Sequence, residues 1–381
     1  MILLKAARIA KAPNAGLASV GVFWGGFSAL VPDLKAGIGA SEAEFGLAMM
    51  VTAVGGIFAM FMAPAVMRRL GPLGLPVAGA FLAASAASPL IPSNPVEFGL
   101  TMILVGAAIS LLDIGSSIRV SVLEERAGVH LMNFSHAMFS FGFAASAFVT
   151  SVARAAGYGP GAILPALAIV NALLILALRE GATWNDAAPA PAGTVARNPW
   201  ALIFLVAGIL FASFVVENAS ETWSAYFIER DLGALPGSGG FGPVALGLTM
   251  GFGRLGGQIV TGRLGEARLV AWSGLIAATG AMVVALAPVP AVAVFGVGCI
   301  GVGAAVLVPS ANSILGRLVR PDQRAHAMSR AWMVGFTGFF VGPAAIGLIA
   351  QHAGLRVAFG VVALLAMMVL PLVRALRRRG A

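Results

Sequence analysis

The stretch VGAAISLLDIGSSIRV at residues 105–120 decides how this chain is interpreted, together with LEERAG at 123–128 and HLMNFSHAMFSFG at 130–142. Asp113 is the one charged residue in an apolar segment long enough to cross a bilayer. An acid at the centre of a membrane helix costs about 2.5–3.5 kcal/mol on insertion scales, so it usually has a role. We therefore expect Asp113 to face a transport pathway or proton relay. A packing bond to a neighbouring helix is the alternative. LEERAG is interpreted as a charged turn between two membrane segments.

The composition is typical of a polytopic membrane protein. Of the 381 residues, 59% are hydrophobic and only 10% are charged, whereas a soluble domain has about 25% charged residues. The 49 glycines suit the close helix packing found in lipid. Cys299 is the single cysteine, so an intramolecular disulfide is impossible.

A membrane helix needs about 20 mostly apolar residues, and the chain offers twelve such segments. Their expected limits are 13–34, 43–67, 73–91, 97–121, 131–155, 160–178, 200–228, 243–264, 268–287, 290–315, 328–350 and 355–376. The expected fold class is therefore an all-α membrane protein with twelve transmembrane helices.

The basic residues predict the orientation of these helices. Most of them flank one side of the twelve spans, and the opposite side holds only Lys35, Arg154, Arg230 and Arg356. Cytoplasmic loops carry the excess of Lys and Arg, so we expect both termini to lie in the cytoplasm. The protein itself is expected to be a multi-pass protein of a bacterial inner membrane. This topology also accounts for the net charge of +9 without a nucleic-acid partner.

The two halves of the chain look like repeats of a six-helix unit. Ser28-Ala29 matches Ser224-Ala225 at an offset of 196, and Gly142 matches Gly338 at the same offset. An Ala/Pro-rich connector separates the halves. We expect an N-terminal bundle at 1–179, a cytoplasmic linker at 180–198 and a C-terminal bundle at 199–381. Parallel six-helix repeats of this kind are typical of one large class of transporters.

Charged and polar residues within the spans are candidates for a transport site. Glu217 and Glu221 share a helix face, and one of two neighbouring carboxylates can hold a proton; a solvated position at the interface is the alternative for Glu221. Arg254 lies mid-span and calls for a carboxylate partner, Glu217 or Asp113. The remaining cavity candidates are Trp24, Ser117, His136, Ser140, Trp223, Asn312 and Trp332.

Enzymatic chemistry is not indicated. The sequence has no Cys/His cluster with metal spacing, no Walker loop and no visible nucleophile–base pair. Gly296, Gly298 and Gly301 match a dinucleotide-binding pattern, but they lie in an apolar span without a preceding strand. Helix contact explains these glycines better, and we expect neither cofactor nor metal.

Several motifs resemble those of the major facilitator superfamily, over about residues 13–376. APAVMRRLGPLGLP is similar to the family's basic gating loop, with Arg69 and Gly71 matching and Arg68 where the family has an acid; TGRLGEARL keeps Arg263 and Glu266. FSALVPDLK, NFSHAMFSFG, ENASETWSAY, MGFGRLGG and GFTGFFVGPAAIG further resemble a bacterial branch of fucose-permease-like carriers. This resemblance implies the major facilitator fold, a cavity formed by spans one, four, seven and ten, and proton coupling through Asp113.

Together these features predict a secondary carrier for a small polar organic solute, such as a sugar. It would work by alternating access as a monomer in the bilayer, coupled to protons through Asp113 and Glu217. A proton-driven exporter of drugs or amphipathic metabolites is the alternative. A wide apolar cavity would favour export, and convergent hydroxyl partners would favour a sugar. The altered loop at Arg68 motivates a third possibility, a receptor or scaffold that does not transport.

Overall fold

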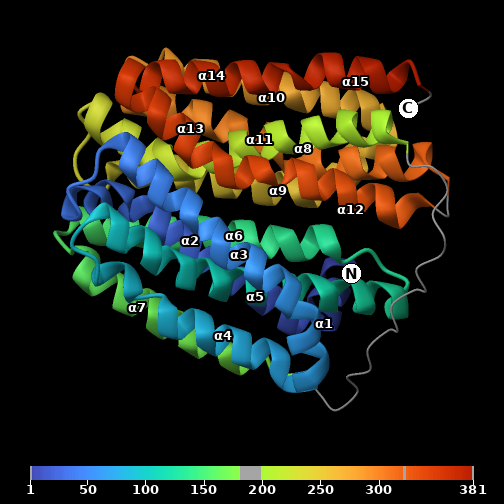
Figure 1. Cartoon of the computed structure of the whole chain (residues 1–381), viewed down its shortest axis with the longest axis horizontal. Helices are drawn as coiled ribbons and strands as arrows, with labels where there is room; N and C mark the ends of the chain where they lie inside the picture. Colours follow the sequence, from blue (N-terminus) through green and yellow to red (C-terminus); the bar gives the residue numbers. More distant parts are fainter. Residues whose placement is uncertain (1, 181–198, 321–322, 380–381) are drawn as a thin grey trace.

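The structure is a computed structural model that describes residues 2–180, 199–320 and 323–379, and these ranges are helical without strands. The expected linker lies outside the described residues, apart from Glu180. Long helices lie side by side in one bundle (Figure 1). The expected all-α fold class is confirmed.

The helices fall into two sets in chain order. The first set is α1 (Ile2–Ile9), α2 (Lys11–Gly37), α3 (Glu42–Leu70), α4 (Gly74–Ser85), α5 (Pro95–Ala127), α6 (Met132–Ala155) and α7 (Pro160–Leu174). The second set is α8 (Trp200–Tyr226), α9 (Phe241–Leu264), α10 (Glu266–Ala285), α11 (Pro290–Leu318), α12 (Arg324–Gly335), α13 (Thr337–Ala353), α14 (Leu355–Met367) and α15 (Val369–Arg377). A π-helical turn, η4 (Phe227–Asp231), extends α8.

Ten stretches of the described residues are long and apolar enough to cross a membrane. One of them, Glu42–Leu90, has 49 residues. As a single helix it would be about 74 Å long, more than twice the ~30 Å hydrocarbon core. The chain instead turns at Gly71, whose φ is +52°, so this stretch crosses twice as α3 and α4. With α9, a further helix of 24 residues, the described residues provide the twelve expected crossings.

LEERAG is helical and not a turn, which corrects one expectation. α5 continues through Ala127 and ends at Gly128, which has a left-handed φ of +61°. Leu, Glu, Arg and Ala are all good helix formers, so the helix extends until a glycine permits the left-handed cap.

An offset of 196 residues relates the helices of the two sets. Shifted by this offset, α5 falls on α11 and α6 falls on α12 and α13. Gly142 and Gly338 also occupy matching contacts. A Cβ on Gly142 would lie 2.6 Å from the Ala18 carbonyl oxygen, and a Cβ on Gly338 would lie 2.5 Å from that of Phe211. Each glycine lets its helix touch the first long helix of its own set, α2 or α8, as the expected duplication predicts.

The two sets pack against each other along α3 with α13, α6 with α9 and α2 with α8. In Figure 1 the first set, blue to green, lies below the second set, yellow-green to red. The backbones touch near the start of α3. A Cβ on Gly46 would lie 2.4 Å from the Pro343 carbonyl oxygen, and a Cβ on Gly347 would lie 2.4 Å from that of Glu42.

We predict that Gly55→Ala destabilises the protein. Gly55 lies where α3 meets α5, and an added Cβ would be 1.8 Å from the Ile103 carbonyl oxygen. Small residues allow such backbone approach in membrane helices, and overpacking costs about 1–3 kcal/mol. Thermal unfolding in detergent, followed by tryptophan fluorescence, should show a lower midpoint. Gly360→Ala is the matched control, because nothing lies within 4 Å of its added Cβ. An equal midpoint for the two variants would contradict the packing argument.

Candidate functional site

A cavity of about 320 Å³ lies between the two sets of helices. α2, α3, α5 and α6 line it from the first set, and α8, α9, α11, α12 and α13 from the second. Spans one, four, seven and ten, which were expected to form a cavity, correspond to α2, α5, α8 and α11, and all four contribute lining residues. The predicted residues that line it are Trp24, Asp113, His136, Glu217, Glu221, Arg254, Asn312 and Trp332.

The cavity is closed at one end and open at the other. Thr52 and Glu221, at its deep end, are only 8% and 7% exposed, whereas Trp332 is 37% exposed. A second hollow of about 460 Å³ continues from Arg254 to Glu266. We call this open side, where α9 ends and α10 begins, the Glu266 end. We call the closed side, where α2 ends and α3 begins, the Arg154 end.

A buried ion-pair cluster closes the Arg154 end. The Arg154 guanidinium donates to both carboxylate oxygens of Asp33, at 2.7 Å each, and to both oxygens of Glu229, at 2.5 and 2.8 Å. Arg154 and Asp33 belong to the first set and Glu229 to the second. The backbone N–H groups of Gly237 and Gly239 also donate to Glu229. Because the buried arginine bonds acids from both sets, the cluster holds the two sets together.

Glu42 makes a second contact between the sets at the same end. Its carboxylate accepts a hydrogen bond from the Tyr226 hydroxyl at 2.9 Å, and it forms ion pairs with Arg230 and, at 3.6 Å, with Lys35. Tyr226 and Arg230 come from the second set, and Lys35 from the first. The two clusters together account for the closure.

Arg254 crosses between the sets in the middle of the cavity. From α9 it donates to the Ser140 hydroxyl at 2.6 Å and to the His136 carbonyl at 3.2 Å, both on α6 of the first set. Its second terminal nitrogen, Nη2, donates to the Glu217 carboxylate on α8 at 3.2 Å. The partner that the sequence left open between Glu217 and Asp113 is therefore Glu217.

Two further carboxylates line the cavity without such a partner. Asp113 and Glu221 make no hydrogen bond or ion pair with the residues that the structure describes, and Arg254 is the cation that acts on both electrostatically. The alternative of a solvated interfacial Glu221 is wrong, because α8 presents Phe214, Glu217 and Glu221 as one stripe to the cavity. A buried carboxylate without a partner calls for a proton or a cationic ligand.

Comparison with known proteins agrees with this geometry. The family model of the Major Facilitator Superfamily matches residues 218–381. An uncharacterised MFS-type transporter of Yersinia pestis is 28% identical over 351 residues, covering 92% of this chain and 91% of that protein. An uncharacterised transporter of Sinorhizobium fredii is 27% identical, covering 96% and 97%. Residues 218–381 therefore resemble the Major Facilitator Superfamily, and most of the chain is similar to proteins described as transporters.

Solved structures of transporters share the fold. A bacterial homologue of the human lysosomal transporter Spinster superposes with a TM-score of 0.73 at 12% identity, over 98% of this chain and 97% of that one. The nucleoside transporter NupG superposes with a TM-score of 0.72 at 13% identity, over 97% and 99%. The family and the relatives named here are transporters and not enzymes.

Aromatic rings form the wall of the cavity along α8, α12 and α13. Phe214 packs against Trp332 and Phe336, with ring centroids 5.6 and 5.2 Å apart, and Phe336 stacks on Phe339 at 5.5 Å. The Asn312 side chain accepts a hydrogen bond from Trp332 at 3.0 Å. Trp332 of this wall was expected from the sequence, but the phenylalanines were missed, although GFTGFFVG at 335–342 carries three of them.

Three expected cavity residues lie elsewhere. Trp223 is fully buried against Phe45 and Tyr226, because two residues along a helix turn it about 200° from Glu221. Ser140 is buried behind the lining and positions Arg254. Ser117 is not among the lining residues, since it lies about 6 Å further along α5 than Asp113.

The expected gating-loop residues lie at the Glu266 end. Arg68 and Arg69 are exposed at the end of α3, and Gly71 caps that helix. Arg263 is exposed at the end of α9. Glu266 forms an ion pair with Arg317 and accepts a hydrogen bond from Ser313 at 2.5 Å. This acid therefore ties the start of α10 to α11.

Arg119 and Glu180 form a further ion pair, beyond the hydrophobic part of α7. Burial raises the pKa of the Glu180 carboxyl, and the charges of Arg119 and Arg126 oppose that shift. The pair joins α5 to the first residue of the expected linker.

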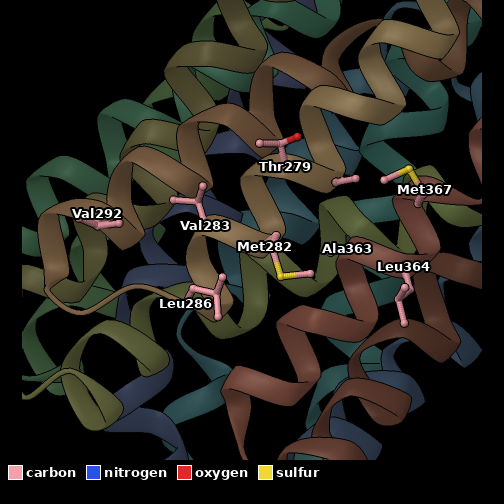
Figure 2. Close-up of a pocket in the computed structure, with 9 residues that line it drawn as sticks. Thr279, Met282, Val283, Leu286, Val292, Ala363, Leu364 and Met367 are labelled. Atoms are coloured by element: carbon pink, nitrogen blue, oxygen red, sulfur yellow. The ribbon is translucent and has the colours of Figure 1, made fainter.

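A separate groove of about 440 Å³ lies on the surface between α10 and α14 (Figure 2). Met282, Leu286, Leu364 and Met367 line it, and Thr279 is its single polar side chain among the described residues. Without a charged group it offers no place for a polar solute or a proton. The cavity between the sets is therefore the candidate transport site.

Proposed function

We propose that this protein is a proton-coupled secondary transporter that moves a small organic solute across the inner membrane by alternating access. One observation carries the proposal. A cavity between the two helix sets holds two carboxylates, Asp113 and Glu221, that have no hydrogen bond or ion pair among the described residues, and ion pairs between the sets close its Arg154 end. Carriers of this architecture work by rocking one set against the other around such a site.

Asp113 is the proposed proton-coupling residue. Its charge lies in the cavity wall without a hydrogen-bond partner among the described residues. Closing the Glu266 end would remove water from the carboxylate, and an isolated buried charge is costly. Protonation removes that charge and so permits the occluded state.

Arg254 would transmit the protonation state to the helix sets. Its bonds to Ser140 and the His136 carbonyl join it to the first set, and its ion pair with Glu217 keeps it on the second. Protonation of Glu217 would release one side of this bridge. Movement of the sets would then break the bonds from Arg254 to Ser140 and to the His136 carbonyl.

The Glu266 end carries most of the basic residues, so we propose that it faces the cytoplasm. The two bundles at 1–179 and 199–381 would be the moving units. Membership of the fucose-permease-like branch also stays a proposal. The aromatic wall favours a solute with an apolar ring, because the side-chain oxygen of Asn312, one of the expected cavity residues, already accepts a hydrogen bond from Trp332.

Transport by purified protein in proteoliposomes tests this function. An imposed pH gradient should drive at least one member of a panel of sugars, organic acids and organic cations, and a protonophore should stop it. A dye in the lumen should report matching proton movement. Protein-free liposomes are the control. Solute flux that is indifferent to the gradient would remove proton coupling, and the absence of any flux would favour the non-transporting alternative.

A further inference from the structure

We propose that the substrate is an organic cation, an amine attached to an apolar ring, and that Glu221 binds its ammonium group. This inference rests on the proposed transport function and names the substrate class of the same cavity. It starts from the charges of the cavity. Arg254 is satisfied by Glu217, Ser140 and the His136 carbonyl, whereas Glu221 has no hydrogen bond or ion pair among the described residues.

Glu221 is not alone at the closed end of the cavity. The Thr52 hydroxyl is buried there without a hydrogen-bond partner among the described residues. Buried polar groups in folded proteins are nearly always hydrogen-bonded. A ligand ammonium group would satisfy both, since it donates three hydrogen bonds and carries the charge that Glu221 needs.

Three side chains from three helices lie at one level. The ion pairs of Glu42 with Lys35 and Arg230 align α2, α3 and α8 at the Arg154 end. Counted from these pairs at 1.5 Å per residue, Trp24, Thr52 and Glu221 each lie about 14–17 Å into the bundle. All three line the cavity. A carboxylate, a hydroxyl and an indole ring form the kind of site that binds an ammonium group, with the ring adding a cation–π interaction.

Asp113 lies one layer nearer the opening. A Cβ on Gly106 would be 2.2 Å from the Thr52 carbonyl oxygen, so these two residues share a level. Asp113 follows two helical turns later on α5, about 10 Å further toward the Glu266 end. The proton-coupling acid and the proposed ammonium site are therefore separate. Asp113 would take the proton, and Glu221 would bind the ammonium group of the ligand.

The space between these two layers is lined by aromatic rings. Phe340 lies 3.8 Å from the position of a Cβ on Gly56, one turn beyond Thr52, and Phe214 lies about 10 Å from Glu221 along α8. A ring attached to the amine by a short chain would lie against this wall. Neutral sugars would leave Glu221 without a cation, and an organic anion would be repelled by it.

Calorimetric titration of the full-length protein in detergent tests the proposal with three matched probes. They are 2-phenylethylamine, 2-phenylethanol and 3-phenylpropionate, which carry an ammonium, a hydroxyl and a carboxylate on the same ring and spacer. We expect the amine to bind at least tenfold more tightly than the other two. Equal binding of amine and alcohol, or preference for the carboxylate, would overturn the proposal.

Variants assign the binding to Glu221. Glu221→Gln should weaken amine binding at least tenfold, and Thr52→Val should weaken it by less. Glu125→Gln is the matched control, because Glu125 is exposed outside the cavity and should leave binding unchanged. Glu221→Asp keeps the charge and should retain part of the affinity, which guards against a folding defect in the first variant. Unchanged amine binding by Glu221→Gln would overturn the assignment.

Transport separates this proposal from the function on which it rests. Proton-driven flux of a neutral sugar, without amine binding, would leave the transporter intact and refute the cationic substrate. Amine binding without flux of the amine would support the ammonium site at Glu221 and refute transport of the amine. Binding of Na⁺ alone would assign Glu221 to a metal cation and also refute the organic substrate.

Discussion

Asp113→Asn is expected to abolish solute accumulation driven by a pH gradient while solute exchange continues. Asn has nearly the shape of Asp and mimics the protonated acid, so the helix sets can still move around the cavity. The variant can neither release nor take up a proton at this position. With one proton per solute, each pH unit of gradient sustains about a tenfold accumulation of solute. The variant should show no accumulation driven by the gradient.

Paired flux measurements in proteoliposomes check this expectation. Counterflow of labelled against unlabelled solute at equal pH should remain close to that of the wild type, and uptake driven by the gradient should vanish. Glu125→Gln again serves as the control for loss of an acid, since its side chain is exposed. If Asp113→Asn still accumulates solute, Asp113 is not the coupling residue, and Glu217 becomes the next residue to replace.

Arg154→Gln is expected to open the Arg154 end. The substitution removes the bond between the sets and leaves Asp33 and Glu229, both partners of Arg154, without their cation. Breaking a buried ion pair from one side costs about 3–5 kcal/mol. A shift of that size changes a conformational equilibrium by more than a hundredfold, so the closed state should lose its dominance.

Spin labels at Ala36 and Leu235 can measure this shift in a Cys299→Ser background. Both residues are exposed at the Arg154 end, Ala36 at the end of α2 and Leu235 in the loop before α9. The distance distribution should move to longer values in Arg154→Gln. Arg356→Gln is the matched control, because Arg356 bonds the Ala285 carbonyl within its own set. An unchanged distribution in Arg154→Gln would refute the role of the cluster.

Much of the cavity could be predicted because few charged residues lie in the membrane. The cost of placing a charge in hydrocarbon singles out Asp113, Glu217 and Arg254 from the sequence alone, and all three line the cavity. The expectation failed for Trp223, since a plausible residue type does not say which face of the helix meets the cavity. The rotation of α8 is fixed by packing, which directs Trp223 into the core.

The Arg154 cluster was missed although the sequence contained a signal for it. Asp33 and Glu229 are related by the same 196-residue offset as the helices, and both bind Arg154. The sequence placed Arg154 on one side of the membrane spans but did not single out the two acids. It could not show that one arginine would bridge the two related acids, because contacts between repeats depend on how the sets are docked.

The sequence by itself determined the class, the twelve crossings and the duplicated helix pattern of this protein. Hydrocarbon imposes a length and a polarity on every span, and those constraints can be recognised locally. Only the tertiary structure decided that Arg254 pairs with Glu217, that Glu221 is buried and that the Arg154 end is closed. These features arise between helices distant in the chain, where packing and electrostatics select one of several partners that the sequence alone leaves equivalent.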